Sequence, residues 1–314
     1  MELKKMIAPF DAAEVLQHLE QIFGIEERLL EECQLNGSES DLNRDIVYLA
    51  YENNTLLGMI HATIPLSTPY VAGLSAMFTT DAARGKGLGK ILFGKIVEEV
   101  SSHDVRLTVL GTSNPIAAKL YAQFGFGFCP GSNVMARFSK GNMVDFSRDY
   151  YQKIQGTAKI LRGDPSMRIP MIPLVLQTNF GLILDINTSI FNCATITERS
   201  CMGLFPRYVA LRKQGGDFYM VFDEAGTLGA VGSVSPQEGG LFRADFFSLP
   251  AFEPVIPELI DKIEDTFGKV YFEIACNDNT KERILKENGF NPMEEGCCKT
   301  EDFLIRTVKY CRDK

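Results

Sequence analysis

The stretch that most constrains this chain stands between a predicted apolar strand and a predicted amphipathic helix, and it reads Arg84-Gly85-Lys86-Gly87-Leu88-Gly89-Lys90. Its alternating glycines let the backbone turn tightly and bring N–H groups within hydrogen-bonding distance of a ligand. Apolar residues recur every three or four positions as far as Val100, so the helix packs on a sheet and its N-terminus faces the loop. Helix N-termini attract anions, and Arg84, Lys86 and Lys90 add positive charge. The stretch therefore predicts a cradle for a phosphate or pyrophosphate group.

Two common phosphate-binding loops do not fit this stretch. A dinucleotide-binding G-x-G-x-x-G loop would need glycine at Lys90 or Leu92. A Walker loop would need glycine at Arg84 and a hydroxyl residue at Ile91. The pattern is instead R-x-x-G-x-G after a strand, which excludes both of those classes of nucleotide-binding protein.

A second motif follows the next predicted strand, Val105 to Leu110. It runs from Asn114 to Phe126 and reads N-x-x-A-x-x-L-Y-x-x-x-G-F. Asparagine is a good helix cap, and the proline after it suits the first helical position. The motif therefore predicts a helix that starts beside the cradle and carries Tyr121.

Together the two motifs resemble the GCN5-related N-acetyltransferases, the GNAT superfamily. The resemblance covers about Met6 to Arg137, in the order helix, hairpin, strand, cradle, helix, strand, helix, strand. It implies an α/β fold of the α+β kind with a mixed sheet, acetyl-CoA or coenzyme A as co-substrate, and an amine as acceptor. It also implies that Tyr121 protonates the departing sulfur and that the co-substrate contacts Met77, Phe78, Thr79, Arg84, Gly85, Lys86, Gly87, Leu88, Gly89, Lys90 and Asn114.

The general base is not marked by any motif. The strand before the cradle has no acidic residue ahead of Asp81, and His61 is a candidate by residue type alone. His18 and His103 lie on other predicted elements, so neither a triad nor a metal site is indicated and no metal is expected. A base that acts through ordered water is an equal alternative. Simple packing remains the alternative role for Tyr121, as helix capping does for Asn114.

The second half of the chain resembles a degenerate repeat of the first. A hairpin at Phe218 to Val234 corresponds to the one at Ile46 to Thr63, and the stretch from Asp278 to Phe290 corresponds to the one from Asn114 to Phe126. The second pair of motifs is seven residues closer together than the first, and we expect that loss in the cradle. The corresponding stretch, Leu249 to Pro254, has neither arginine nor glycine.

These patterns predict two tandem GNAT-like domains, each a mostly antiparallel sheet flanked by helices. The N-terminal, cofactor-binding domain is expected at residues 1–142, a connecting segment at 143–175, and a degenerate C-terminal domain at 176–314. A length of 314 residues is natural for two domains of about 150 residues each. The resemblance also implies that the region formed by a predicted short helix, Glu26 to Cys33, and the loop from Gln34 to Asp45 walls the acceptor site.

Composition narrows the setting. A net charge of −8 argues against nucleic acid as a partner, and no apolar run approaches the roughly 20 residues of a membrane span. The N-terminus lacks the apolar core of a signal peptide, which predicts a cytoplasmic protein with reduced cysteines. Isolated cysteines such as Cys33, Cys129, Cys193, Cys201, Cys276 and Cys311 are expected to be buried, and a redox role for Cys297 and Cys298 is left open.

The sequence thus predicts an acetyl-CoA-dependent N-acetyltransferase that acts by direct transfer on a primary amine of a small molecule or peptide. One alternative is a non-enzymatic regulator that binds acyl-CoA. Another is a transferase that uses a longer acyl or an aminoacyl donor, because the length of the pocket beyond the sulfur sets donor choice.

Overall fold

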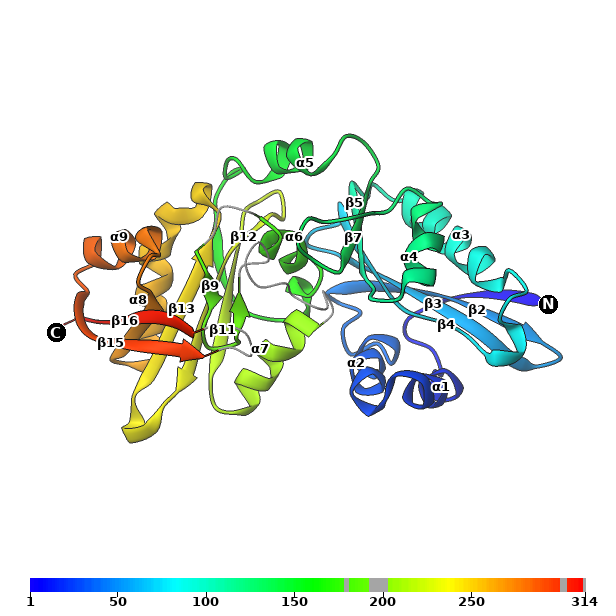
Figure 1. Cartoon of the computed structure of the whole chain (residues 1–314), viewed down its shortest axis with the longest axis horizontal. Coiled ribbons are helices and arrows are strands. Elements are labelled where there is room, and N and C mark those ends of the chain that lie inside the picture. The colour runs from blue at the N-terminus through cyan, green and yellow to red at the C-terminus, as the bar shows by residue number, and fades with distance from the viewer. Residues whose placement is uncertain (178–180, 192–202, 300–303, 313–314) are drawn as a thin grey trace.

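The chain folds into two halves, each built on a seven-stranded sheet (Figure 1). The computed structural model describes residues 1–177, 181–191, 203–299 and 304–312. Strands of the first sheet lie between residues 2 and 138, and those of the second between 159 and 311. The predicted fold class, two GNAT-like α/β halves with mixed sheets, is therefore confirmed.

The first sheet has the strand order β1-β2-β3-β4-β5-β7-β6, and only the β4–β5 pair is parallel. Helices α1 and α2 cover one face of this sheet, and α3 and α4 cover the other (Figure 1). The predicted helices, hairpin and strands are all present, whereas β1 was not predicted. The elements are β1 (Glu2–Ile7), α1 (Ala13–Phe23), α2 (Ile25–Leu35), β2 (Asn43–Glu52), β3 (Thr55–Pro65), β4 (Val71–Thr79), α3 (Leu88–Ser101), β5 (Leu107–Gly111), α4 (Pro115–Ala122), β6 (Gly127–Phe128) and β7 (Val134–Phe138).

A wedge opens where β4 and β5 separate. The two strands pair only from Val71 to Gly73 against Leu107 to Val109, and β4 continues to Thr79 without that neighbour. Within this free part Ala76 has φ 48°, a left-handed conformation that a side-chain-bearing residue seldom adopts. The pairing of β3 with β4 shifts register at the same place, so Ala76 belongs to a β-bulge that re-aims the strand.

The second sheet repeats this topology. Its order is β8-β11-β12-β13-β14-β16-β15, and again only the fourth and fifth strands, β13 and β14, are parallel. Helices α8 and α9 take the places of α3 and α4 in chain order, and a small pair of strands, β9 and β10, precedes α7. The elements are β8 (Lys159–Arg162), β9 (Ile183–Asp185), β10 (Ile190–Phe191), α7 (Leu204–Lys213), β11 (Asp217–Phe222), β12 (Leu228–Pro236), β13 (Phe242–Ser248), α8 (Ile256–Phe267), β14 (Val270–Ala275), α9 (Asn279–Glu287), β15 (Asn291–Lys299) and β16 (Leu304–Cys311).

The predicted connecting segment is not a simple linker. After α5 (Met143–Tyr150), β8 joins the second sheet, and residues 167 to 175, which include α6 (Met171–Val175), are buried. Helix α6 lies between the two sheets (Figure 1). Ile169 packs on Gly73 of β4 so closely that a Cβ atom on Gly73 would collide with it. The segment therefore covers the part of the first sheet that α1 and α2 leave open, and the domain bounds given above stay a prediction.

Polar contacts reinforce this apolar junction. Thr68 Oγ1 donates to the Gly226 carbonyl at 2.7 Å, and the Tyr70 hydroxyl donates to Thr227 Oγ1 at 3.1 Å. Arg168 Nη2 donates to Glu39 Oε2 at 2.6 Å, and both of these side chains are buried. Because buried charges are costly unless paired, this ion pair fixes how the segment sits on the first half.

The cysteines differ from expectation in part. Cys129 is buried as predicted, but Cys33 and Cys276 are exposed, and Cys311 is half-buried. Cys193 and Cys201 lie outside the described residues. Burial raises the pKa of the Cys298 thiol, which disfavours the reactive thiolate at that position.

Candidate active site

The loop before α3 has the geometry of an anion cradle. Gly85 and Gly87 have φ values of 76° and 80°, which glycine adopts readily, and Gly87 caps the helix. The first helical hydrogen bond runs from the Ile91 N–H to the Gly87 carbonyl, so the N–H groups of residues 88–90 have no partner within the helix. A Cβ atom on Gly85 or Gly87 would meet nothing within 4 Å. The space in front of α3 is therefore open and lined by backbone donors.

Gly89 has a different reason to be glycine. A Cβ atom there would lie 3.3 Å from the Met77 side chain. Gly89 therefore lets the first turn of α3 approach β4 closely, and the wedge at the end of β4 meets the cradle.

A groove of about 970 Å³ runs from the cradle to α4. Eleven of the twelve predicted site residues line it: Met77, Phe78, Thr79, Arg84, Gly85, Gly87, Leu88, Gly89, Lys90, Asn114 and Tyr121. The twelfth, Lys86, is exposed and is not one of the lining residues. Arg84 lies at the surface and forms an ion pair with Asp81. Two motifs distant in sequence are thus brought together in one groove.

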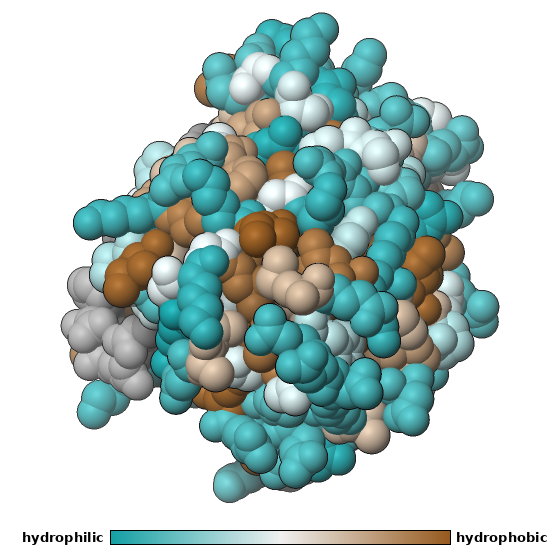
Figure 2. All heavy atoms as spheres, turned by 90° about the vertical axis from the view of Figure 1, so that its right-hand side faces the viewer, coloured by the Kyte–Doolittle hydropathy of each residue, from teal (hydrophilic) through white to brown (hydrophobic). Residues whose placement is uncertain are grey.

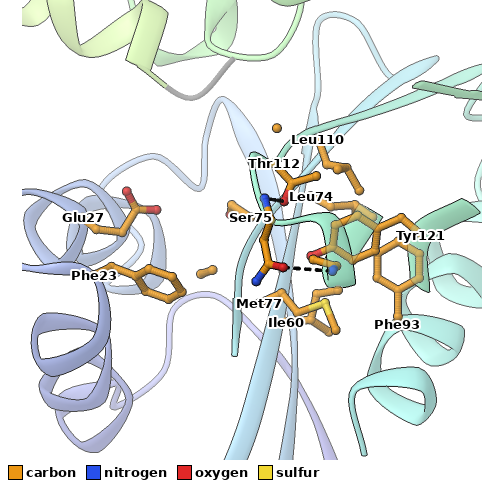
Figure 3. A pocket seen from close by; sticks show the side chains of 14 residues that line it. Phe23, Glu27, Ile60, Leu74, Ser75, Met77, Phe93, Leu110, Thr112 and Tyr121 are labelled. Atoms are coloured by element: carbon orange, nitrogen blue, oxygen red, sulfur yellow. Dashed lines mark hydrogen bonds between the residues drawn. The ribbon is translucent and has the colours of Figure 1, made fainter. Parts of the chain in front are cut away.

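A deeper cavity of about 260 Å³ shares Met77, Asn114 and Tyr121 with the groove and extends toward α2 (Figure 3). The Tyr121 ring stacks on Phe93 with 4.5 Å between ring centroids. Burial raises the pKa of Tyr121 to about 12, so the phenol keeps its proton at neutral pH. No hydrogen bond between described residues uses its hydroxyl. Tyr121 is therefore positioned to donate to a ligand in the cavity.

Asn114 is a helix cap, as its alternative role predicted. Its Oδ1 accepts from the N–H of Ile116 at 2.9 Å and of Ala117 at 3.4 Å, and its own N–H donates to Thr112 Oγ1 at 3.1 Å. These bonds hold the side chain at the wall that the groove and the cavity share. Capping uses only the amide oxygen, so a role toward a ligand through Nδ2 is compatible with it.

Glu27 on α2 is the site residue that the sequence did not reveal. It lies across the cavity from Tyr121 (Figure 3), and among the described lining residues it is the single carboxylate. Burial and, next, the charge of Glu31 raise the pKa of Glu27 to about 7, while His61 acts in the opposite direction. A carboxylate with this pKa can both accept and release a proton near neutral pH. Together with Phe23, it shows that α1 and α2 wall the cavity. Glu27 belongs to the predicted short helix of the region expected to form a wall, whereas no residue of the loop from Gln34 to Asp45 lines this cavity.

The structure contradicts His61 as a candidate for the general base. Its side chain is wholly buried, with Nδ1 2.7 Å from Glu31 Oε2 and Nε2 3.0 Å from Asp45 Oδ1. Burial lowers the pKa of His61, but the two carboxylates outweigh that effect and raise it to about 10. The ring is therefore an imidazolium at neutral pH and has no lone pair for a proton. It instead supports the cavity wall, because Ser75, which lines the cavity, donates to the other oxygen of Glu31 at 2.9 Å.

In the described part of the second half, the stretch before α8 has none of the glycines and cations of the cradle, and the pocket at the corresponding wedge is smaller. The same turn is present, since the Phe252 N–H bonds to the Leu249 carbonyl as the Ala83 N–H bonds to Thr80. The next residue, however, is Glu253 in place of Arg84, and it pairs with Arg283. The wedge between β13 and β14 retains only about 70 Å³.

The position of the missing residues also differs from the prediction. The first half uses eight residues from Thr80 to the start of α3 at Leu88, and the second uses seven from Leu249 to the start of α8 at Ile256. Only one of the seven missing residues therefore falls in the cradle. The change that matters there is chemical, because glycines and cations are replaced.

With this geometry in place, comparison with known families decides the assignment. Residues 13–126 match the Acetyltransferase (GNAT) family, a range that ends at Phe126 of the second motif. Residues 13–126 of this chain form a GNAT acetyltransferase domain. GNAT acetyltransferases use acetyl-CoA, and the open cradle with its backbone donors fits the phosphates of that co-substrate.

Solved structures that resemble the chain match about half of it. An acetyltransferase of the GNAT family from Staphylococcus aureus has 14% identity and a TM-score of 0.38, and covers 50% of this chain and 98% of its own. A ribosomal L7/L12 alpha-N-protein acetyltransferase in complex with coenzyme A has 15% identity and a TM-score of 0.37, with coverages of 51% and 95%. A spermidine N-acetyltransferase chimera from Vibrio cholerae and hSSAT has 10% identity and a TM-score of 0.37, with coverages of 49% and 94%. No curated protein matches the chain.

Proposed function

We propose that this protein transfers the acetyl group of acetyl-CoA directly to a primary amine in the cavity between α2 and α4. The observation that carries the proposal is that Glu27 and Tyr121 lie on facing walls of one cavity, at the end of the groove that begins at the cradle. One group is suited to take a proton from the amine, and the other to give a proton to the leaving sulfur. A site with only one of these two groups would be equally compatible with a protein that binds the co-substrate without transferring its acetyl group.

The chain's own residues would hold the co-substrate in three places. The N–H groups of residues 88–90, with Lys90 beside them, would bind the phosphates. The unpaired edge of β4 from Met77 to Thr79 would hydrogen bond the amide groups of the pantetheine arm, and the Asn114 amide would orient it. Acetyl-CoA supplies an activated acetyl group as a thioester. The other residues predicted to contact it, including Arg84 and Lys86, remain part of this proposal.

The proton transfers follow from the positions of the two side chains. Glu27 accepts a proton from the bound ammonium group, which gives the nitrogen a lone pair. As that nitrogen bonds to the acetyl carbon and the C–S bond breaks, Tyr121 donates its proton to the sulfur. Tyr121 then recovers a proton from the new amide nitrogen. The balance is one ammonium and one thioester converted to one amide, one thiol and one proton held by Glu27.

We also propose that the second half is a GNAT-like copy that has lost its co-substrate site. The shared strand order and the retained turn before α8 support this, and a first domain at 1–142 followed by a second at 176–314 is consistent with the two sheets. None of the described helices is long and apolar enough to cross a membrane. A cytoplasmic location remains a prediction from the N-terminal sequence.

The test is release of coenzyme A thiol with a panel of primary amines, and identification of the acetylated product by mass spectrometry. We expect amine-dependent release that is much slower, but still measurable, in Glu27→Gln. Coenzyme A binding without transfer to any amine would favour the acyl-CoA-binding regulator. Transfer from longer acyl-CoA thioesters at equal rates would favour the other alternative.

A further inference from the structure

We infer that the acceptor is a small amine that carries one positive charge on an apolar body, and that it lies between Phe23, Glu27 and Leu74. This inference rests on the proposed function and names its substrate class. Three properties of the cavity lead to it: its charge, its walls and its size.

The charge of the cavity fits one ammonium group. Of the described lining residues, Glu27 is the single side chain that carries a charge near neutral pH, because Tyr121 keeps its proton. A polyamine would bring a second ammonium group into a space with no second carboxylate. An amino acid would bring a carboxylate into a space with no Lys, Arg or His. A buried charge without a partner is strongly disfavoured, so the cavity selects against both classes.

The walls of the cavity are apolar except near the reacting groups. Ile60, Leu74 and Leu110 form the inner wall, and Phe23 projects into the cavity from the α1 side (Figure 3). The polar side chains Ser75, Thr112 and Asn114 already have hydrogen-bond partners within the protein. An acceptor rich in polar groups would find few partners here, whereas an alkyl or aryl group would displace water from apolar walls.

Large apolar side chains are exposed at the mouth. Phe23 is 47% exposed, Ile22 39% and Ile116 78%, although all three line the groove that leads to the cavity. Figure 2 looks onto the end of the molecule formed by the first half, and hydrophobic atoms are exposed across the middle of this face. Apolar side chains exposed at the mouth of a groove are typical of binding sites, and an apolar acceptor would cover part of Phe23.

The cavity is small. Its volume of about 260 Å³ lies just below the range of roughly 300–1,000 Å³ that is usual for sites of drug-sized ligands. The pantetheine end of the co-substrate would share this space, which leaves room for a compact acceptor. A folded protein surface or a long peptide would reach it only with a single side chain or terminus.

The test compares amines that differ by one property. Phenethylamine carries the proposed features, phenylalanine adds a carboxylate, spermidine adds ammonium groups, and ethanolamine lacks the apolar body. We expect kcat/KM for phenethylamine to exceed each of the others by about 100-fold or more, since unpaired charges and missing apolar contacts both cost binding. A peptide with a free N-terminus serves as the macromolecular competitor. Equal or better kcat/KM for spermidine, phenylalanine or the peptide would overturn the inference.

Two variants assign the preference to the cavity. Phe23→Ala should lower kcat/KM for phenethylamine about 10-fold more than it lowers kcat/KM for ethanolamine. Ile25→Ala is the matched control, because Ile25 is an exposed apolar residue two positions after Phe23 that is not among the lining residues of either the groove or the cavity. An equal loss in both variants would contradict the placement of the acceptor at Phe23.

A binding measurement separates this inference from the proposed function. If some other amine class is acetylated in a Glu27-dependent manner, the function stands and the acceptor class is wrong. If no amine is acetylated, the function is wrong, and calorimetry of phenethylamine with coenzyme A-loaded protein decides the class. Binding that Glu27→Gln weakens would support the acceptor class in that case, and no binding would overturn it.

Discussion

The two wedges of this molecule are formed by corresponding strands, but one is open and the other is filled. In the first half, β4 and β5 separate beside a helix whose N-terminus follows Gly85 and Gly87, and the space between them stays open. In the second half, β13 and β14 separate in the same way, but α8 follows Glu253 and Pro254. Helix α8 still buries Leu259, Ile260 and Ile263 against its sheet. The fold thus depends on apolar faces that both halves have, whereas the cradle depends on a few loop residues that the corresponding stretch of the second half does not contain.

The second wedge is filled by the chain itself. Ile183 and Leu184 of β9 are buried in it, and Lys281 Nζ donates to their carbonyl oxygens at 3.1 and 2.9 Å. The same ammonium group donates to Asp245 Oδ1 at 2.6 Å. Lys281 stands three residues after the cap of α9, Asp278, as Ala117 stands three residues after Asn114. Where the open wedge has a small residue, the filled wedge has a buried cation that donates hydrogen bonds to β9.

The largest expected effect on the difference between the two halves is loss of coenzyme A binding on substitution of Gly87. Wild-type protein should bind one equivalent of coenzyme A per chain, and Gly87→Val should bind at least about 100-fold more weakly. A branched side chain disfavours the left-handed backbone that the cradle needs and occupies the open space before α3. Isothermal titration calorimetry measures both the affinity and the stoichiometry.

Gly239→Val is the control for backbone strain. Gly239 has φ 74° and open space around a Cβ atom, but it lies in a turn of the second half. The Gly239→Val variant should lose about as much stability as Gly87→Val but keep the wild-type affinity for coenzyme A. A wild-type titration that reaches two equivalents would show that the second wedge opens after all.

The next effect concerns Tyr121, whose position in the second half is taken by Leu285. Tyr121→Phe should lower kcat by about 10²–10⁴, the range for one general acid, with coenzyme A affinity and melting temperature nearly unchanged. Tyr70→Phe should do the reverse, because the Tyr70 hydroxyl bonds to Thr227 across the junction of the halves. Normal turnover in Tyr121→Phe would leave the tyrosine with a packing role.

Lys281 tests whether the filled wedge is structural. Lys281→Met should destabilise the protein by about 3–5 kcal/mol, because it leaves the Asp245 carboxylate buried without its cation. Chemical denaturation measures this loss, and Lys286→Met on the same helix, where the ion pair is exposed, should cost less than about 1 kcal/mol. Adding Asp245→Asn should restore part of the stability. If Lys281→Met is no less stable than Lys286→Met, the wedge does not depend on this ion pair.

The smallest expected effect is a pH dependence. Activity should rise with pH as Glu27 loses its proton, with an apparent pKa of about 7, and Glu27→Gln should flatten this limb of the profile. The raised pKa also means that Glu27 costs stability as pH rises from 4.5 to 7, since the folded state holds the proton longer than the unfolded state. Glu27→Gln should therefore be more stable than wild type above pH 7. A profile unchanged by the substitution would exclude Glu27 as the base.

Local motifs were sufficient to find the cradle and the Asn114 cap, because short-range backbone geometry and capping dictate those residue types, whereas Tyr121 was singled out by the family resemblance of its motif. Glu27 gave no such signal, since its position in the cavity depends on how α2 packs across the first sheet. The bulge at Ala76 was hidden because a left-handed backbone there is not marked by glycine. His61 was misjudged because its two acidic partners come from different elements. The Pro-rich stretch after Gly163 indicated a connection, although its apolar residues from Met167 to Val175 belong to a core.

The contact of Ile169 with Gly73 has a consequence for whether the first half can fold without the rest of the chain. A gene cut after residue 142 would yield a first half whose sheet exposes Val71, Leu107 and Val109 and whose Glu39 has lost its Arg168. The first half, which holds the proposed active site, is thus tied to the second by packing as well as by sequence. The junction makes the connecting segment part of the core on which the first sheet rests.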